Sequence, residues 1–260
     1  MRRFLAPCAF GIVCILVLFA SPKTGQAAAA SDATSRYNQA GALYRDGKFR
    51  EALDIYESLI TAGVKNPDLF FNAANAAYRS DMIGKAVLYT ERALRLDPSD
   101  RDALANLEFL NSKKLDKDPS PGNAVTAFLE RRYRQINVNS AASWSAAAFA
   151  LMMIAGMGAL FTVGWKRNTI LAAVGVCGMT FILSTGILVT KVRSAANTVE
   201  AVIMKPEINA FSGPDDENTH IFTVHEGTKA TVERTQGGWA LIRLGSGVGG
   251  WVMSDGFERI

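Results

Sequence analysis

Residues 40–60 read AGALYRDGKFREALDIYESLI, and residues 74–94, which begin 34 positions later, read ANAAYRSDMIGKAVLYTERAL. The two stretches share alanine at Ala40 and Ala74 and at Ala52 and Ala86, and tyrosine at Tyr44 and Tyr78. Small side chains recur where two helices cross closely, and such a helix pair buries its apolar face only by stacking on a neighbour. The spacing therefore predicts two stacked helix–turn–helix units, with turns at Gly47 and Asp81.

The second unit ends in the run ERALRLDP at residues 91–98. Proline at the end of this run favours the start of a new helix, where its missing N–H costs little. One further helix is predicted from Asp102 to Leu115, with Leu104 and Leu107 on its apolar side, and it is a suitable cap. We assign an all-α domain of helical repeats to residues 31–117.

These stretches resemble the tetratricopeptide repeat family, through the small residue, Tyr, Gly, Phe, Ala, Tyr pattern of residues 40–56 and through residues 91–98. Asp81 departs from the family's turn glycine, and Thr90 departs from its aromatic residue. In that family the first helices of the repeats line a groove that accepts peptide segments. The groove residues implied here are Asn38, Arg45, Asn72, Asn75, Arg79 and Asn106. Asparagine amides can hydrogen-bond the backbone of an extended peptide; the alternative is that they only bridge neighbouring helices.

Two uncharged apolar stretches follow, residues 141–165 and 168–190, separated by Lys166 and Arg167. At about 1.5 Å per helical residue each stretch spans roughly 35 Å, which exceeds the hydrocarbon core of a bilayer, about 30 Å. The two stretches are therefore predicted to form a transmembrane hairpin of two helices.

The amino terminus predicts a signal peptide over residues 1–27, with a basic start, an apolar run at residues 4–20 and small residues up to Ala27. An uncleaved anchor is the alternative, and both place residue 31 onward outside the cytoplasm. We expect a protein of the bacterial inner (cytoplasmic) membrane, with its helical and β modules in the periplasm and a short cytoplasmic loop at residues 166–168. Basic residues at the outer ends of the hairpin favour the opposite orientation, so the orientation rests on the amino-terminal signal.

Residues 118–140 are predicted to form a linker and an amphipathic juxtamembrane helix, because the prolines and glycine of residues 118–123 break the preceding helix. The apolar residues assigned to one face are Val125, Phe128, Leu129, Tyr133 and Ile136, and the charged residues assigned to the other are Glu130, Arg131, Arg132 and Arg134. Such a helix suits the lipid headgroup layer. Packing on the repeats is the alternative.

Residues 197–260 change to short alternating runs separated by turns, which predict five or six strands in a small all-β barrel. The module resembles the bacterial SH3-like (SH3b) family through Ser212-Gly213-Pro214, Glu226-Gly227-Thr228, Gly238-Trp239 and Gly249-Gly250-Trp251-Val252. That family binds peptides or cell-wall glycopeptide in aromatic clefts, and the candidates here are Phe211, Trp239 and Trp251. The alternative is that the two tryptophans form most of the core.

Composition argues against several functional classes. The chain has 28 basic and 24 acidic residues, and the excess of positive charge lies beside apolar stretches, where it orients membrane helices and does not indicate nucleic-acid binding. The three cysteines, Cys8, Cys14 and Cys177, also lie in apolar stretches, and the two histidines are His220 and His225. We therefore expect no cofactor, no metal site and no enzymatic activity.

The order of signal, repeats, basic segment, hairpin and β module resembles the BatE-type membrane proteins of the Bat (aerotolerance) group. Residues 66–75, 98–100 and 136–144 carry this resemblance. It implies partnership with membrane proteins that bear von Willebrand A (VWA) domains and with a MoxR-type ATPase, in stress tolerance. The predicted function is a non-enzymatic scaffold for protein–protein interaction in the cell envelope; the alternative is an envelope anchor whose β module binds peptidoglycan.

Overall fold

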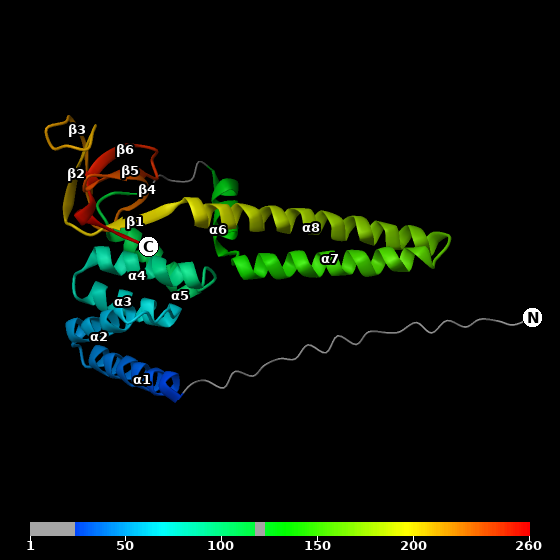
Figure 1. The fold of residues 1–260 in the computed structure, drawn as a ribbon, viewed down its shortest axis with the longest axis horizontal. Coiled ribbons are helices and arrows are strands. Elements are labelled where there is room, and N and C mark those ends of the chain that lie inside the picture. The colour runs from blue at the N-terminus through cyan, green and yellow to red at the C-terminus, as the bar shows by residue number, and fades with distance from the viewer. Residues whose placement is uncertain (1–23, 118–122) are drawn as a thin grey trace, which may run out of the picture.

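The computed structural model describes residues 24–117 and 123–260, with side chains from residue 31 onward (Figure 1). Two predicted segments lie partly outside the described residues: residues 1–23 of the predicted signal peptide and residues 118–122 of the predicted linker. The described residues form eight α-helices and one antiparallel sheet of seven strands. The predicted combination of a helical part, two long apolar helices and an antiparallel β part is therefore confirmed at that level.

Five helices form a stack. They are α1 (Thr24–Arg45), α2 (Phe49–Thr61), α3 (Pro67–Arg79), α4 (Ile83–Leu96) and α5 (Arg101–Lys113). Asn66 and Asp100, which are 34 positions apart, cap α3 and α5 by accepting hydrogen bonds from backbone N–H groups of the first turn. Helix α5 therefore begins one residue before the predicted start at Asp102, and it ends at Lys113, two residues before the predicted end at Leu115. Alanines at 73, 74, 76, 77, 86 and 93 are buried, so the helices pack closely.

The turns within the two helix pairs have the same geometry. Gly47 and Asp81 both adopt positive φ, at 79° and 58°, and Asp81 is the one residue other than glycine to do so among those described. The N–H of Gly47 donates to the carbonyl of Tyr44 at 3.1 Å, and the N–H of Asp81 donates to that of Tyr78 at 3.1 Å. The 34-residue spacing in the sequence thus corresponds to two turns of the same geometry in the structure.

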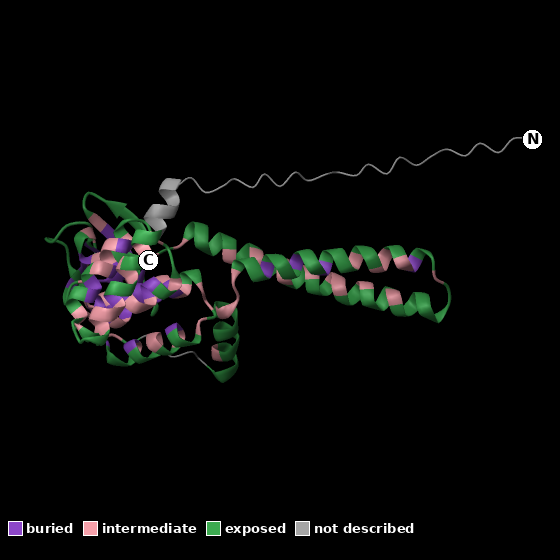
Figure 2. Ribbon diagram, turned by 90° about the horizontal axis from the view of Figure 1, so that it is seen from below, coloured by how far each residue is buried: buried purple, intermediate pink, exposed green. Residues whose placement is uncertain are grey.

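Helices α7 (Val138–Leu160) and α8 (Trp165–Asn197) form a long antiparallel pair, and each is long and apolar enough to cross a membrane. Figure 2 shows that this pair is largely exposed, unlike the helical stack. The hydroxyls of Ser145 and Ser184 lie 2.9 Å apart between the two helices. The turn occupies residues 161–164, with Gly164 at φ 65°, so the predicted bounds of 141–165 and 168–190 are shifted and Lys166 and Arg167 belong to the first turn of α8.

The sheet comprises β1 (Val199–Ile203), β2 (Glu207–Phe211), β3 (His220–His225), β4 (Lys229–Gln236), β5 (Trp239–Leu244), β6 (Gly249–Met253) and β7 (Phe257–Arg259). Its order is β3-β2-β6-β5-β4-β1-β7. The prediction of five or six strands missed β7, a strand of three residues that follows a 3-10 turn and pairs with β1. Trp251 is buried, but the core cluster consists of aliphatic residues such as Val224, Ile242 and Val252, so the alternative that tryptophans form most of the core is wrong.

The sheet packs against the helical stack, and α1 lies at the far end of the stack (Figure 1). Strand β1 contacts α4, and Val202 of β1 belongs to the same buried cluster as the alanines of the stack. The two parts therefore share one hydrophobic core at their junction.

Candidate functional site

A cavity of about 420 Å³ opens beside α1 and α3. Its lining residues are Tyr37, Asn38, Gly41, Tyr44, Arg45, Tyr56 and Asn72. Three of the six residues predicted for the groove, Asn38, Arg45 and Asn72, lie in this lining. Asn38 and Arg45 come from α1 and Asn72 comes from α3, two helices that each begin a helix pair.

Tyrosines make up much of the cavity wall, and the sequence analysis did not select them. The rings of Tyr37 and Tyr56 lie 5.8 Å apart, and the amide of Asn72 donates to the hydroxyl of Tyr37 at 2.5 Å. Burial, followed by the nearby Tyr37 and Tyr44, raises the pKa of Tyr56 to about 12. Burial also raises the pKa of Tyr37. Both hydroxyls therefore stay protonated at neutral pH and can donate as well as accept hydrogen bonds.

Gly41 lies on the wall of the cavity between these side chains. A β-carbon at this position would be 3.7 Å from the guanidinium of Arg45 and 3.8 Å from the hydroxyl of Tyr56, which is ordinary contact distance. Gly41 is thus not required by close packing of the helices, and its missing side chain contributes to the open space.

The other three predicted groove residues do not line the cavity. The amide of Asn106 donates to Asn75 at 3.3 Å and to the hydroxyl of Thr90 at 3.4 Å, which links α5 to α3 and α4. The guanidinium of Arg79 lies 4.1 Å from the centre of the Phe49 ring. These residues connect neighbouring helices, which is the alternative that the sequence analysis had left open for the asparagines.

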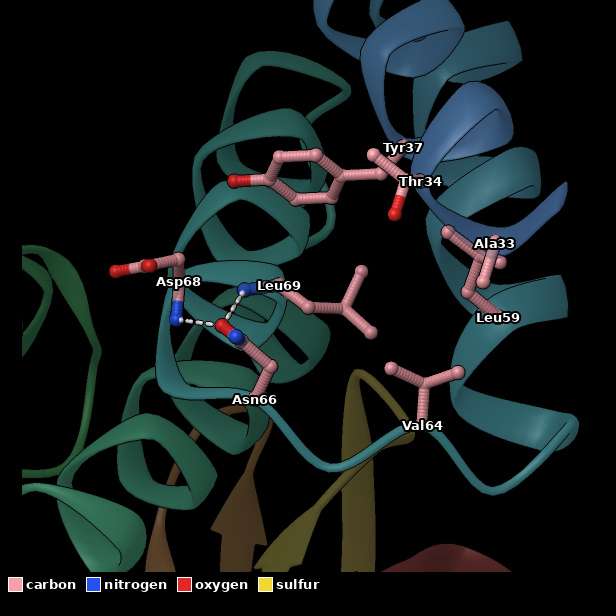
Figure 3. A pocket seen from close by; sticks show the side chains of 8 residues that line it. All are labelled: Ala33, Thr34, Tyr37, Leu59, Val64, Asn66, Asp68 and Leu69. Carbon is pink, nitrogen blue, oxygen red and sulfur yellow. Dashed lines mark hydrogen bonds between the residues drawn. The ribbon is translucent and has the colours of Figure 1, made fainter. Parts of the chain in front are cut away.

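A smaller cavity of about 200 Å³ lies further toward the amino terminus of α1 and shares Tyr37 with the first (Figure 3). Asn66 lines it, but its side-chain oxygen accepts hydrogen bonds from the backbone of Asp68 at 2.7 Å and of Leu69 at 3.2 Å. Asn66 is therefore engaged in capping α3. Tyr37 stands between the two cavities and is in reach of a ligand in either.

The aromatic residues predicted for the β module come together on one side of the sheet. The Phe211 and Trp239 rings lie 5.8 Å apart in an edge arrangement, and the His220 ring lies 6.0 Å from Phe211. Phe211 pairs with Trp251 across neighbouring strands, and the guanidinium of Arg234 lies 5.2 Å from the Trp251 ring. Trp251 is only 7% exposed, so Phe211 and Trp239 are the more accessible members of this cluster.

The sheet is fixed to the helices by polar contacts at the turn between β3 and β4. One carboxylate oxygen of Asp116 accepts from the backbone N–H of His225 at 2.7 Å and from the hydroxyl of Thr228 at 2.9 Å. Its other oxygen lies 3.0 Å from Nδ1 of His225. Burial alone raises the pKa of Asp116, but the hydrogen bonds from His225 and Thr228 outweigh it, and the pKa is lower than usual.

Glu226 in the same turn accepts a hydrogen bond from the backbone N–H of Gly84 at 2.6 Å. Gly84 lies in the first turn of α4, where Met82 provides no side-chain cap. A carboxylate at a helix amino terminus is favourable because of the unpaired N–H groups and the helix dipole. The sheet thus supplies the cap that α4 lacks.

Lys229 joins the two parts through an ion-pair cluster. Its ammonium lies 3.0 Å from Glu91 of α4 and 3.1 Å from Glu200 of β1. Burial by itself lowers the pKa of Lys229, but the two carboxylates outweigh this effect and the pKa is raised. Lys229 therefore stays charged at the junction between stack and sheet.

The described residues hold no group of three or more His, Cys, Asp or Glu side chains that could bind a metal ion. The cysteine among them, Cys177, lies in α8. His220 packs against Phe211, and His225 is engaged with Asp116.

No family model and no curated protein matches the chain. Solved structures with some likeness include NlpC1 from Trichomonas vaginalis, at 16% sequence identity and a TM-score of 0.23, covering 24% of this chain and 24% of that chain. NlpC2 from the same organism gives 18% identity and a TM-score of 0.22, covering 24% of this chain and 25% of that chain. The chain thus spans about a quarter of the length of these proteins, and a likeness of this size assigns neither a fold nor a site.

These neighbours belong to the NlpC/P60 proteins, which are cysteine peptidases. This finding contradicts the prediction that the chain is not an enzyme. The prediction had rested on the small number of cysteines and histidines, which describes composition and does not measure activity.

Proposed function

We propose that this protein is a membrane-anchored scaffold whose helical stack, of the tetratricopeptide repeat type, binds an extended peptide segment of a partner protein in the cell envelope. The cavity beside α1 and α3 carries the proposal, because it combines amides, tyrosine hydroxyls and one guanidinium in a space of about 420 Å³. Amides and hydroxyls can hydrogen-bond the backbone of a bound peptide, and the guanidinium of Arg45 can pair with a carboxylate of that peptide. The preferred ligand is a peptide with an acidic side chain or terminus at Arg45.

The two apolar helices support the membrane anchor, and the β module is proposed to be SH3-like, with the cluster of Phe211 and Trp239 as its binding surface. The periplasmic placement of both modules rests on the amino-terminal sequence. By resemblance to the Bat group, VWA-domain membrane proteins and the MoxR-type ATPase system are the partners to test first. A partner that contacts both the cavity and the aromatic cluster gains effective concentration for its second contact.

Site-specific photo-crosslinking in cells tests the cavity. A photoreactive residue replaces Asn38 in the cavity, and the matched control replaces Lys113, an exposed residue of α5. We expect a defined protein adduct from position 38 that disappears when Arg45 is changed to Gln, since loss of a charge-assisted hydrogen bond costs about 1.5–3 kcal/mol, or roughly tenfold or more in affinity. Equal adducts at positions 38 and 113, or none at 38, would contradict peptide binding in the cavity.

A second candidate function is anchoring to peptidoglycan through the β module, and the contact of Phe211 with Trp239 favours it because aromatic rings stack on sugar faces. The test is co-sedimentation of the solubilised protein with purified wall sacculi. Anchoring predicts sedimentation that Trp239→Ala abolishes and that Arg45→Gln leaves unchanged. The scaffold function predicts no sedimentation of either variant or of the parent protein.

A further inference from the structure

Helix α6 (Ala124–Gln135) has a large apolar surface that no described part of the chain covers. None of its residues is buried. Val125 is 67% exposed, and Phe128 and Leu129 are both 59% exposed. The alternative of an amphipathic helix packed on the repeats is therefore wrong for the described residues. Asn123 caps α6 with a reciprocal capping box, so the helix has a well-defined start without help from a neighbouring element.

The orientation of α6 is set by the end of the hairpin. Figures 1 and 2 both show α6 running across the direction of α7 and α8, beside the end of the pair that meets the sheet and the stack. The hydroxyl of Tyr133 lies 3.1 Å from that of Thr190 in α8. The ammonium of Lys191 donates to the carbonyl of Arg134 at 3.3 Å and lies 4.5 Å from the centre of the Tyr133 ring. If α7 and α8 span a bilayer, a helix that runs across their direction lies along the plane of that bilayer.

The level at which α6 meets α8 matches the edge of the hydrocarbon layer. The uncharged run of α8 extends over residues 168–190 and is followed by Lys191. At about 1.5 Å per residue this run spans roughly 35 Å, slightly more than the hydrocarbon core. Helix α6 contacts Thr190 and Lys191 of α8. Thr190 is the last residue of the uncharged run, and Lys191 is the first charged residue after it. Helix α6 therefore lies where acyl chains give way to headgroups.

The charges on α6 indicate which headgroups it meets. It carries three arginines, Arg131, Arg132 and Arg134, against one acidic residue, Glu130. The guanidinium of Arg132 lies 5.8 Å from the centre of the Phe128 ring, so Arg132 belongs beside the apolar face and not on the opposite face where the sequence analysis had placed it. An arginine in this position extends its stem along apolar surface and directs its charge to phosphate.

We propose that α6 is an interfacial helix that inserts Val125, Phe128 and Leu129 between lipids and binds anionic phospholipid headgroups through its arginines. This proposal rests on the proposed membrane anchoring of α7 and α8. It adds a lipid-binding site to the protein, and it makes the position of the helical stack depend on the charge of the leaflet.

Spin labels measure the depth of α6 in the full chain. In a background with all three cysteines changed to serine, single cysteines are placed at Val125, at Glu130 on the opposite side of α6, and at Ile182 in α8, which is 65% exposed. The protein is reconstituted in bilayers of phosphatidylcholine with phosphatidylglycerol. We expect labels at 125 and 182 to be more accessible to oxygen, and the label at 130 to be more accessible to a water-soluble nickel complex. A water-exposed label at 125 with a lipid-exposed label at 182 overturns the proposal alone, whereas water exposure at 182 overturns the membrane anchor.

A charge variant tests the headgroup. Arg131, Arg132 and Arg134 are all changed to Gln, and the control changes three exposed basic residues outside α6, Arg101, Lys113 and Lys117, to Gln. Native mass spectrometry then measures the dissociation constant of phosphatidylglycerol. We expect at least about a tenfold weakening in the α6 variant, since each basic residue at a membrane surface contributes appreciably, and none in the control. Equal affinity in both variants, each with unchanged helical circular dichroism, overturns the lipid site.

Discussion

Asp81 adopts a backbone conformation that glycine adopts more easily. Its φ of 58° is in the left-handed region, and the equivalent turn in the first helix pair uses Gly47 at φ 79°. A β-carbon in this region is unfavourable by about 1 kcal/mol or more, although aspartate tolerates it better than most residues. The hydrogen bond from its N–H to Tyr78 shows that the turn geometry is kept nonetheless.

Gly47→Ala tests the cost of that conformation without a packing change, because a β-carbon at Gly47 would meet nothing within 4 Å. We expect a loss of about 1 kcal/mol in the free energy of local opening of α1 and α2, from backbone strain alone. Hydrogen exchange of the α2 amides measures it. Gly41→Ala, in the interior of α1, is the matched control and is expected to gain about 0.5–1 kcal/mol.

Gly41→Leu separates binding from stability. The added side chain would enter the cavity beside Arg45 and Tyr56, whereas the helix itself accepts leucine well. We expect the photo-crosslink from position 38 to be lost while the melting temperature stays the same or rises. A variant that melts at the parent temperature and still gives the adduct would show that the ligand lies elsewhere.

A comparison of residues 34 positions apart finds only part of the cavity lining. Asn38, Asn72 and Asn106, three of the predicted groove residues, recur every 34 residues. The cavity, however, forms where the repeats differ: Tyr37, Gly41 and Tyr56 have Phe71, Asn75 and Thr90 at the equivalent positions. Recurrent residues describe the packing that all units share, whereas a cavity needs a local departure from it. Those departures were visible in the sequence and are the signal that was missed.

At the scale of elements, α4 packs in the stack through its own apolar residues, but the sheet supplies polar contacts along its length. Glu226 caps its first turn, and Lys229 pairs with its Glu91. At its carboxyl end, Arg92 pairs with Glu258 at 2.9 Å. These contacts connect residues more than 130 positions apart, and the backbone pattern of neither part predicts them.

Lys229→Met tests this junction. It leaves Glu91 and Glu200 facing each other without their cation, and Glu91 is only 13% exposed. We expect a loss of about 1–3 kcal/mol, less than for a fully buried pair because Glu200 is 40% exposed. Thermal unfolding of the solubilised protein measures it, with Lys205→Met, an exposed pair with Asp255, as the control. If the two variants melt alike, the cluster does not stabilise the junction.

Acid weakens the junction through Asp116. Its pKa is lower in the folded protein than the usual value of about 3.9 for an unfolded chain, so its contribution is complete above that value and is lost as the pH falls through the folded pKa. We expect Asp116→Asn to melt below the parent protein at pH 7 and the difference to shrink below about pH 4. Asp54→Asn, an exposed residue of α2, should show no such difference at either pH.

The elements that the sequence predicted best have strong periodic patterns, and the elements it missed are short or set by distant contacts. Strand β7 has three residues and exists because it pairs with β1, which is about 55 positions away. The sequence predicts the hairpin turn at Lys166 and Arg167, because these two charges interrupt the apolar stretches. The structure turns earlier, at residues 161–164, where Gly164 adopts positive φ.

At the scale of the whole molecule, the stack and the sheet form one body on one end of the hairpin (Figure 1). The sequence alone predicts a helical module and a β module as separate domains joined through the transmembrane hairpin. The contacts of Asp116, Glu226 and Lys229 remove that independence. The cavity and the aromatic cluster are therefore held at a fixed separation, and a partner that uses both must match it.

Topology reporters fused after residues 118, 163 and 260 test the orientation of this body. We expect external, cytoplasmic and external signals in turn, because the predicted amino-terminal signal would export the stack before the hairpin is made. A cytoplasmic signal at 118 or 260 reverses the orientation and places any partner of the cavity in the cytoplasm.

Helix α8 continues to Asn197 and β1 begins at Val199, so Thr198 alone separates a bilayer-length rod from the strand that contacts α4. Because β1 pairs with β4 and contacts α4, a joint of one residue leaves little freedom between α8 and the rest of the molecule. If α7 and α8 span a bilayer as proposed, the cavity lies at a set height over the lipid surface, and a tilt of α8 displaces the cavity parallel to that surface. The proposed scaffold would then reach a ligand on a neighbouring membrane protein only at that height, so it would select its partners by distance from the bilayer as well as by sequence.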